Sequence, residues 1–222
     1  MLLMRRMEIP VIAEVRGIAA AAGCQLVASC DIVVAADNSK FMVPGQKVGL
    51  FCSTPGIALA RAIPHKVALE MLFTGEPIDA QTALQCGLVS RVVPEKEVKF
   101  EALRIAELIG QHSRSVTALG KAFFYAQSEL GVKEAYRYGG KVMVENLKLK
   151  DAQEGITAFT EKRKALFCHK DDKSPDCGNC SCSSPAMELF SDIATSQKSI
   201  LVVASIPRGT QRDNYAQNIA LN

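Results

Sequence analysis

The sequence predicts an α/β fold in its first part, followed by a long helical region. VIAEV (11–15) follows Pro10 and ends before Gly17, which is typical of a short strand that meets a turn. AAAGCQLVASCD (20–31) has helical spacing, and IVVAA (32–36) is an apolar, β-branched run typical of a covered strand. Strand, small-residue turn, helix and strand together predict a right-handed crossover unit.

Capping and breaking signals predict the later elements. FMVPGQKVGLFCSTPG (41–56) contains three glycines and two prolines and is predicted to be largely loop. Helices are predicted at 57–62 and 65–73, and Asp79 is a predicted N-cap for a helix that runs through Gln85. LVSRVV (88–93) is a predicted strand. The pattern from 95 to 167 is helical, with breaks predicted near 110–113, 131 and 150–151.

The character of the chain changes near residue 170. DDKSPDCGNCSCSSP (171–185) is polar and rich in turn-forming residues, which predicts a linker or disordered segment. SILVVASI (199–206) has the composition of a strand, but the rest of this tail has no clear amphipathic period. We therefore divide the chain into a core over 1–94, a helical region over 95–169 and a disordered tail over 170–222.

Composition excludes several classes of function. The net charge of +3 and the absence of tryptophan argue against a dedicated nucleic-acid binder. No run of eighteen apolar residues is present, so no membrane span is predicted. MLLMRRM at the start is too short for a clear signal or transit peptide. Four cysteines lie among apolar neighbours, as expected of buried thiols in a reducing compartment: Cys24, Cys30, Cys52 and Cys86.

Several separated blocks occur in an order that resembles the crotonase (enoyl-CoA hydratase/isomerase) superfamily. The blocks are PVIAEVRGIAAAAGCQLVASCDIVVAADNSKF, VGL, ALEMLFTGEPIDAQTALQCGLVSRVVP and EGITAFTEKRKALF. The resemblance covers roughly residues 5–168. It implies a crotonase-like ββα spiral followed by helices that assemble subunits as trimers or pairs of trimers. It also implies acyl-CoA as the substrate or ligand, with no other cofactor, and a role in mitochondrial fatty-acid metabolism.

The resemblance gives a function to the alanine run in GIAAAAG (17–23). Crotonase enzymes hold the thioester carbonyl oxygen with two backbone N–H groups, and by position one of them is that of Ala22. Small side chains there would let the thioester reach the backbone. The alternative is that the alanines only permit close packing of helix and sheet.

The positions that carry catalytic acids in this family hold other residues here. Hydratases use two carboxylates, and the matching positions are Gln25 and Gly45; isomerase relatives carry an acid near Ser53. None of the three residues can exchange a proton near neutral pH as a carboxylate does. Asp31 is expected at the far end of the helix, in a supporting role. Cys24 and Cys52 lack a neighbouring histidine in the family layout, so we expect inert thiols.

The resemblance also assigns a CoA-binding role to two residues near the end of the helical region. Phe159 and Lys162 match the aromatic residue and the lysine that approach CoA from the terminal helix, although a solvated basic face is an equal alternative. The family's A-F-x-x-G-x-D segment, which supplies the second oxyanion donor, precedes the PVIAEV strand. Because the chain starts close to that strand, we expect the spiral to lack its first turns, as in a shortened isoform or an incomplete gene model.

Three functions remain open at this point. The first is an acyl-CoA hydratase or isomerase that uses unusual residues, and the second is an acyl-CoA binder without standard hydratase activity, which the missing acids favour. The third is an interaction or structural subunit that does not bind CoA. Dinucleotide, P-loop and nucleophile-elbow motifs are absent. A zinc site at 168–182 is not expected, because its cysteines lack a second well-spaced pair: Cys168, Cys177, Cys180 and Cys182, with His169.

Overall fold

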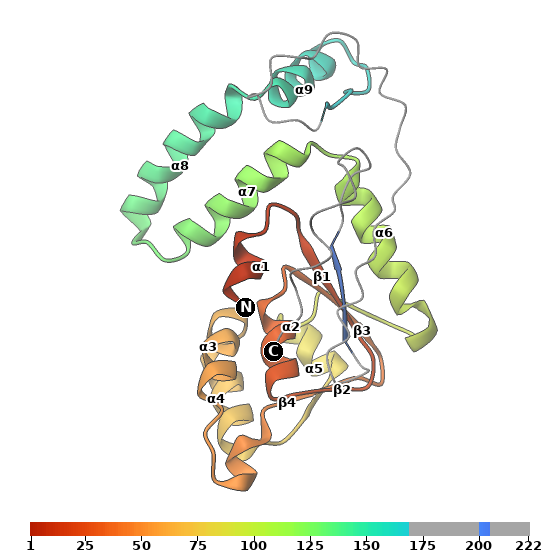
Figure 1. Cartoon of the computed structure of the whole chain (residues 1–222), viewed down its shortest axis with the longest axis vertical. Coiled ribbons are helices and arrows are strands. Elements are labelled where there is room, and N and C mark those ends of the chain that lie inside the picture. The colour runs from red at the N-terminus through yellow and green to blue at the C-terminus, as the bar shows by residue number, and fades with distance from the viewer. Residues whose placement is uncertain (169–199, 205–222) are drawn as a thin grey trace, which may run out of the picture.

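The computed structural model describes residues 1–168 and 200–204 and contains two small sheets surrounded by helices (Figure 1). The main sheet has the order β6-β3-β1-β7, with β6, β3 and β1 parallel and β7 antiparallel to β1. Its strands are β1 (Val11–Val15), β3 (Ile32–Ala36), β6 (Arg91–Val93) and β7 (Ile200–Ala204). The second sheet contains β2 (Ile18–Ala20), β4 (Lys40–Met42) and β5 (Ile78–Asp79).

Helices cover both faces of the main sheet and extend beyond it. The elements of the first part are α1 (Leu2–Arg6), α2 (Ala22–Ser29), the 3-10 helix η1 (Pro44–Val48), α3 (Ser53–Ala62), α4 (His65–Thr74) and α5 (Ala80–Gln85). Those of the second part are the 3-10 helix η2 (Glu95–Glu97), α6 (Val98–Gly110), α7 (Arg114–Gln127), α8 (Val132–Leu147) and α9 (Lys150–Thr160). Among the residues that the structure describes, no helix has the length and apolar character needed to cross a membrane.

Side chains along β1 and β3 point alternately to the two faces of the sheet, so each face has its own hydrophobic core. Val11, Ala13 and Val15 point to the face that α2, α3 and α4 cover, and Phe41 and Leu59 fill the same core. The opposite face packs against α6 in a second cluster, whose members are Ile12, Val34, Ala36, Val98, Ala102 and Ala106. Because side chains alternate along a strand, a fully apolar run such as IVVAA requires cover on both sides.

The structure confirms most predicted elements and corrects two of them. Asp79 caps α5 by accepting a hydrogen bond from the Thr82 N–H (2.7 Å), and α8 begins directly after Gly131. The predicted helical start at Ala20 is wrong, because Ala20 belongs to β2 and pairs with Met42 of β4. The same pairing forms a strand inside the stretch predicted as loop. Strand pairing between residues that lie 22 positions apart, Ala20 and Met42, overrides the helical preference of an alanine run.

The predicted disordered tail falls mostly outside the described residues. Within them, residues 200–204 form β7 instead of a disordered segment, in line with the strand composition of SILVVASI. Three of the cysteines considered for zinc, Cys177, Cys180 and Cys182, lie outside the described residues, as does His169. Cys168 is described, and its thiol donates to Asp151 Oδ1 (3.2 Å). The division at residues 94 and 169 stays a prediction.

Candidate functional site

The candidate site lies at the start of α2, where the chain leaves β2. Gly17, with φ 73°, makes the turn between β1 and β2 in a conformation that favours glycine. Ala21 has φ 47° and ψ −112°, and its N–H donates to the Met42 carbonyl (3.0 Å), which fixes the end of β2 beside the end of β4. Ala22 is therefore the first residue of the helix.

The backbone amide of Ala22 is available to a ligand. Along α2, the first bond to the preceding turn runs from the Gln25 N–H to the Ala21 carbonyl (3.0 Å). The Ala22 N–H has no acceptor within 1–168 and 200–204, and the residue is exposed. The first turn of α2 contains no acidic side chain that would offset the positive end of the helix dipole. This arrangement favours a partial or full negative charge beside Ala22.

Gln25 lies in the same turn of the helix, half-buried. Its side-chain amide has no hydrogen-bond partner among the described residues, and its backbone carbonyl accepts from the Ser29 hydroxyl (2.7 Å). An amide donates and accepts hydrogen bonds but does not take up a proton near pH 7. Gln25 can therefore position a water molecule or a polar ligand atom without activating it as a base.

Gly45 lies in η1, where the backbone leaves no room for a side chain. Its N–H points at Cys52 Sγ (3.3 Å), and its carbonyl accepts from the Leu50 N–H (2.9 Å). A Cβ at position 45 would lie 2.5 Å from the Leu50 carbonyl oxygen and 2.7 Å from Cys52 Sγ. A carboxylate therefore does not fit at this position while the 45–52 loop keeps its path.

Ser53 begins α3, and its hydroxyl is used locally. It donates to the Phe51 carbonyl (3.3 Å), and the Ser53 N–H also donates to that oxygen (2.8 Å). No carboxylate contacts this hydroxyl among the described residues, so Ser53 has no base to activate it.

Two thiols close to the site differ in their surroundings. Cys24 lies in α2, fully buried, and burial, followed by the nearby Cys52 and Cys86 thiols, raises its pKa to about 12. Cys24 therefore stays a thiol at neutral pH, which argues against a role as a nucleophile. Cys52 is partly exposed and contacts the Gly45 amide. Sequence reasoning missed this contact, because nothing in the spacing of the two residues indicates that the loop turns back on itself.

Asp31 lies beyond the far end of α2, away from Ala22, and connects the core to α7. Its carboxylate accepts from the Val11 N–H, Lys121 Nζ and the Tyr125 hydroxyl, each at 2.6 Å. Burial, and then the hydrogen bond to Asp31, raises the pKa of Tyr125 above its ordinary value. The three hydrogen bonds of the Asp31 carboxylate connect β1 and α7. Asp31 therefore has a structural role and is not part of the candidate site at Ala22.

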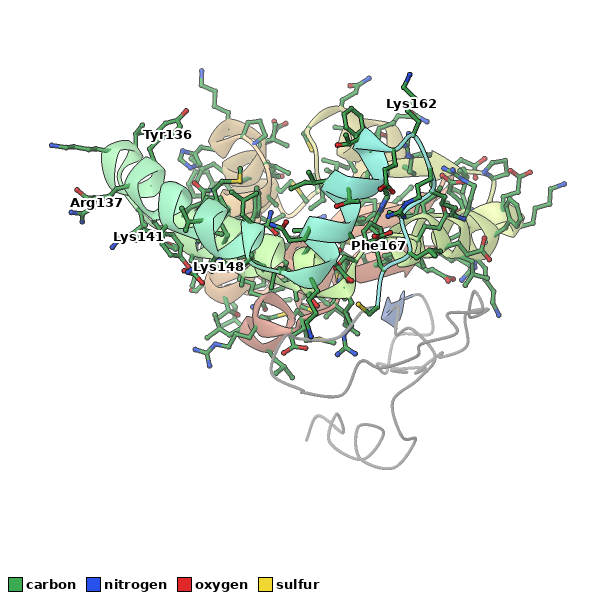
Figure 2. All side chains as sticks on the ribbon, turned by 90° about the horizontal axis from the view of Figure 1, so that it is seen from above. Tyr136, Arg137, Lys141, Lys148, Lys162 and Phe167 are labelled. Atoms are coloured by element: carbon green, nitrogen blue, oxygen red, sulfur yellow. The ribbon has the colours of Figure 1, made fainter. Side chains whose placement is uncertain are left out.

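Phe159 and Lys162 lie at the other end of the molecule. Phe159 is 86% exposed on α9, and Lys162 follows the end of that helix with φ 54°. α9 packs against α7 and α8, and α7 lies between α9 and α2 in Figure 1. Lys162 projects outward at the outer end of this region (Figure 2). Within a single chain, Phe159 and Lys162 therefore do not lie close to Ala22. Within the described residues, no group of three His, Cys, Asp or Glu side chains is arranged to hold a metal.

Comparison with known proteins gives consistent matches over the first three quarters of the chain. A family model described as enoyl-CoA hydratase/isomerase matches residues 1–170. The mitochondrial enoyl-CoA hydratase domain-containing protein 3 of Homo sapiens is 61% identical over 170 residues, which are 77% of this chain and 56% of that protein. Its Xenopus laevis counterpart is 60% identical over 169 residues, 76% of this chain and 58% of that protein. The chain spans less than three fifths of the length of these relatives.

Solved structures show the same fold. The crystal structure of human enoyl coenzyme A hydratase domain-containing protein 3 aligns with a TM-score of 0.73 and 60% identity, covering 75% of this chain and 66% of that one. An enoyl-CoA hydratase from Mycobacterium smegmatis aligns with a TM-score of 0.74 and 47% identity, covering 75% of this chain and 65% of that one. The crotonase-like fold expected from the sequence blocks is thereby confirmed.

Proposed function

Since the chain belongs to the enoyl-CoA hydratase/isomerase family, we propose that it binds acyl-CoA thioesters at the start of α2 and does not carry out standard hydration. The observation that carries the proposal is the amide of Ala22, an exposed residue, because this amide has no acceptor among the described residues. A thioester carbonyl is an acceptor of the size and partial charge that this position favours. The N–H would donate to that oxygen, and the end of the helix would stabilise negative charge that develops on it.

The surface beside the site suits an acyl chain. Val48, Leu50 and Phe51 are exposed on η1 and the loop after it, and Phe73 of α4 lies with its ring centroid 6.3 Å from that of Phe51. α3, which adds the exposed Ile57, packs against both α2 and α4. Exposed apolar side chains whose rings lie close together, as those of Phe51 and Phe73 do, are typical of a ligand or partner site. We place the acyl chain on this surface.

The residues at the two family acid positions argue against standard hydratase chemistry. Hydration needs a base for the attacking water and an acid for the carbon, and the corresponding positions hold Gln25 and Gly45. Gln25 has the wrong chemistry, and Gly45 has no room for a carboxylate. An active hydratase or isomerase with unusual residues is the competing function, and it would need a proton-transfer group other than these.

The position of α9 supports a proposal for where CoA binds and how the chain assembles. Because α7 lies between α9 and α2 within one chain, Phe159 and Lys162 would contact CoA bound to a second copy. We therefore place the chain in a homo-oligomer, which the family resemblance makes a trimer or hexamer, with Lys162 near a CoA phosphate. The relatives are named as mitochondrial, and we extend that location, and a role in fatty-acid metabolism, to this chain.

Replacing Ala22 with proline tests the proposal, because proline removes the N–H at a helix position where it costs no helical hydrogen bond. Butyryl-CoA affinity, measured by isothermal titration calorimetry, is expected to fall about three- to tenfold, as for the loss of one hydrogen bond. The matched control is Ala22→Ser, which keeps the N–H and is expected to bind like the unchanged chain. Thermal unfolding of each variant verifies that α2 still forms.

A crotonyl-CoA hydration assay on the unchanged chain separates the competing functions. We expect turnover far below the roughly 1–10³ per second that is typical of enzymes. Turnover within that range would overturn the proposed lack of hydration. Failure to bind butyryl-CoA, combined with self-association, would instead support an interaction subunit that does not bind CoA.

A further inference from the structure

The edge of β1 is occupied by a strand from outside the family-matched region. That region ends at residue 170, whereas β7 comprises residues 200–204. The two strands pair antiparallel over five residues, from Val11 opposite Ala204 to Val15 opposite Ile200, and lie side by side in Figure 1. We propose that residues 200–204 act as an intramolecular edge strand that closes a strand-docking edge of β1, whichever ligand the site binds.

The backbone of β1 needs a partner on each side. All five of its residues have 0% exposure. Asp31 N–H donates to the Val11 carbonyl (3.0 Å), and β3 pairs in register along the same side. The N–H and C=O groups of successive residues in a strand point to opposite edges. The backbone groups of Val11, Ala13 and Val15 therefore point to β3, and those of Ile12 and Glu14 point to β7.

The backbone groups of β1 that point to β7 would destabilise the fold if they had no hydrogen-bond partner. The N–H and C=O of Ile12 and of Glu14 belong to fully buried residues, away from water. A buried backbone group without a hydrogen bond is destabilising, because it has lost its water partner and gained no protein partner. β7 is the element that pairs with this edge in the described part of the chain. The ladder with β7 therefore supplies bonds that the family-matched region does not supply at this edge.

The sequence around β7 suits this role. ILVVA is apolar and rich in β-branched residues, which favour strands, and it contains neither proline nor glycine. Thirty-one residues connect Cys168 to Ile200, and the Cys168 N–H is held by Asp151 Oδ1 (2.8 Å). A tether of this length gives a local strand concentration on the order of millimolar. At micromolar protein, pairing within one chain therefore prevails over pairing between chains.

A vacant edge would have a direct consequence. A buried strand with unpaired N–H and C=O groups is a template for another chain, and self-association follows. Residues 200–204 would therefore keep β1 from pairing with a second copy.

Hydrogen exchange of the unchanged chain tests the ladder. The proposal predicts slow exchange for the amides of Ile12 and Glu14, comparable with those of Ala13 and Val15, which bond to β3. Fast exchange of Ile12 and Glu14, with Ala13 and Val15 still slow, would show that the edge is open and would overturn the proposal. This comparison is internal to one chain, so it needs no variant that folds less well.

Two proline variants of the full chain sharpen the test. Val203 is opposite Ile12 and presents its N–H to β1, whereas Val202 is opposite Ala13 and presents its N–H outward. Val203→Pro removes a ladder bond, and Val202→Pro is the matched control, because an edge strand tolerates proline where the N–H faces away. We expect about tenfold faster exchange at Ile12 and Glu14, and a larger species in size-exclusion chromatography, for Val203→Pro only. Equal behaviour of the two variants would contradict the proposal.

Discussion

Replacing Asp31 with alanine is expected to lower the free energy of unfolding by about 3–5 kcal/mol. The change removes the acceptor for the Val11 N–H, Lys121 Nζ and the Tyr125 hydroxyl at once. The Lys121 side chain is 7% exposed and would keep the Ile9 carbonyl as an acceptor, at 2.9 Å. A buried ammonium group without a counter-charge is the main cost. Urea denaturation at neutral pH, followed by circular dichroism, measures the effect.

The control for this variant is Asp37→Ala, at the exposed end of β3. An exposed aspartate outside a buried network is expected to change stability by less than about 0.5 kcal/mol. Combining Asp31→Leu with Lys121→Met removes both charges and is expected to recover only part of the loss, because the Val11 N–H and the Tyr125 hydroxyl still lack their acceptor. If Asp31→Ala costs no more than Asp37→Ala, the network does not connect α7 to the core as described.

Introducing a side chain at Gly45 is expected to cost about 1–3 kcal/mol of stability and to confer no hydratase activity. Gly45→Ala places a Cβ 2.5 Å from the Leu50 carbonyl oxygen. This is a backbone atom, so no change of side-chain rotamer relieves the clash. Gly45→Glu adds the carboxylate that the family position carries, but only by displacing the 45–52 loop. We therefore expect crotonyl-CoA hydration to stay low in Gly45→Glu, and also when it is combined with Gln25→Glu.

Gly120→Ala in α7 provides the control, because nothing lies within 4 Å of a Cβ built there. In a helix, this change is expected to raise stability by up to about 1 kcal/mol. Adding Cys52→Ala to Gly45→Ala relieves the contact with Sγ but not the contact with the Leu50 oxygen, so recovery is expected to be partial. Full stability of Gly45→Ala alone, or hydration by the Gly45→Glu chain, would contradict this account of the loop.

Local signals in the sequence predict much of the fold. VIAEV and IVVAA form β1 and β3, the Asp79 cap begins α5, and Gly131 separates α7 from α8. Each of these features depends on residues close in the chain. β2 and β4 could not be predicted in the same way, because Ala20 is a strand residue only through its pairing with Met42. Residues 200–204 form an edge strand only because β1 lies beside them.

The candidate site was predictable in its chemistry and not in its geometry. The resemblance assigns Ala22, Gln25 and Gly45, and their residue types already show that the usual carboxylates are absent. The clash at Gly45 depends on a loop that turns through Gly49, at φ 75°, and returns to Leu50 and Cys52. No spacing rule gives that path. The distance of Phe159 from Ala22 is likewise a property of how α7 and α8 pack.

The most direct test of the proposed function is the amide resonance of Ala22 during titration with an acyl-CoA. Acetoacetyl-CoA presents the thioester carbonyl and forms an enolate, and free CoA is the matched control without an acyl group. We expect the Ala22 N–H resonance to move downfield with acetoacetyl-CoA, because that N–H gains an acceptor. Free CoA is expected to leave it in place. An Ala22 resonance that does not move when acetoacetyl-CoA saturates the chain would contradict the account.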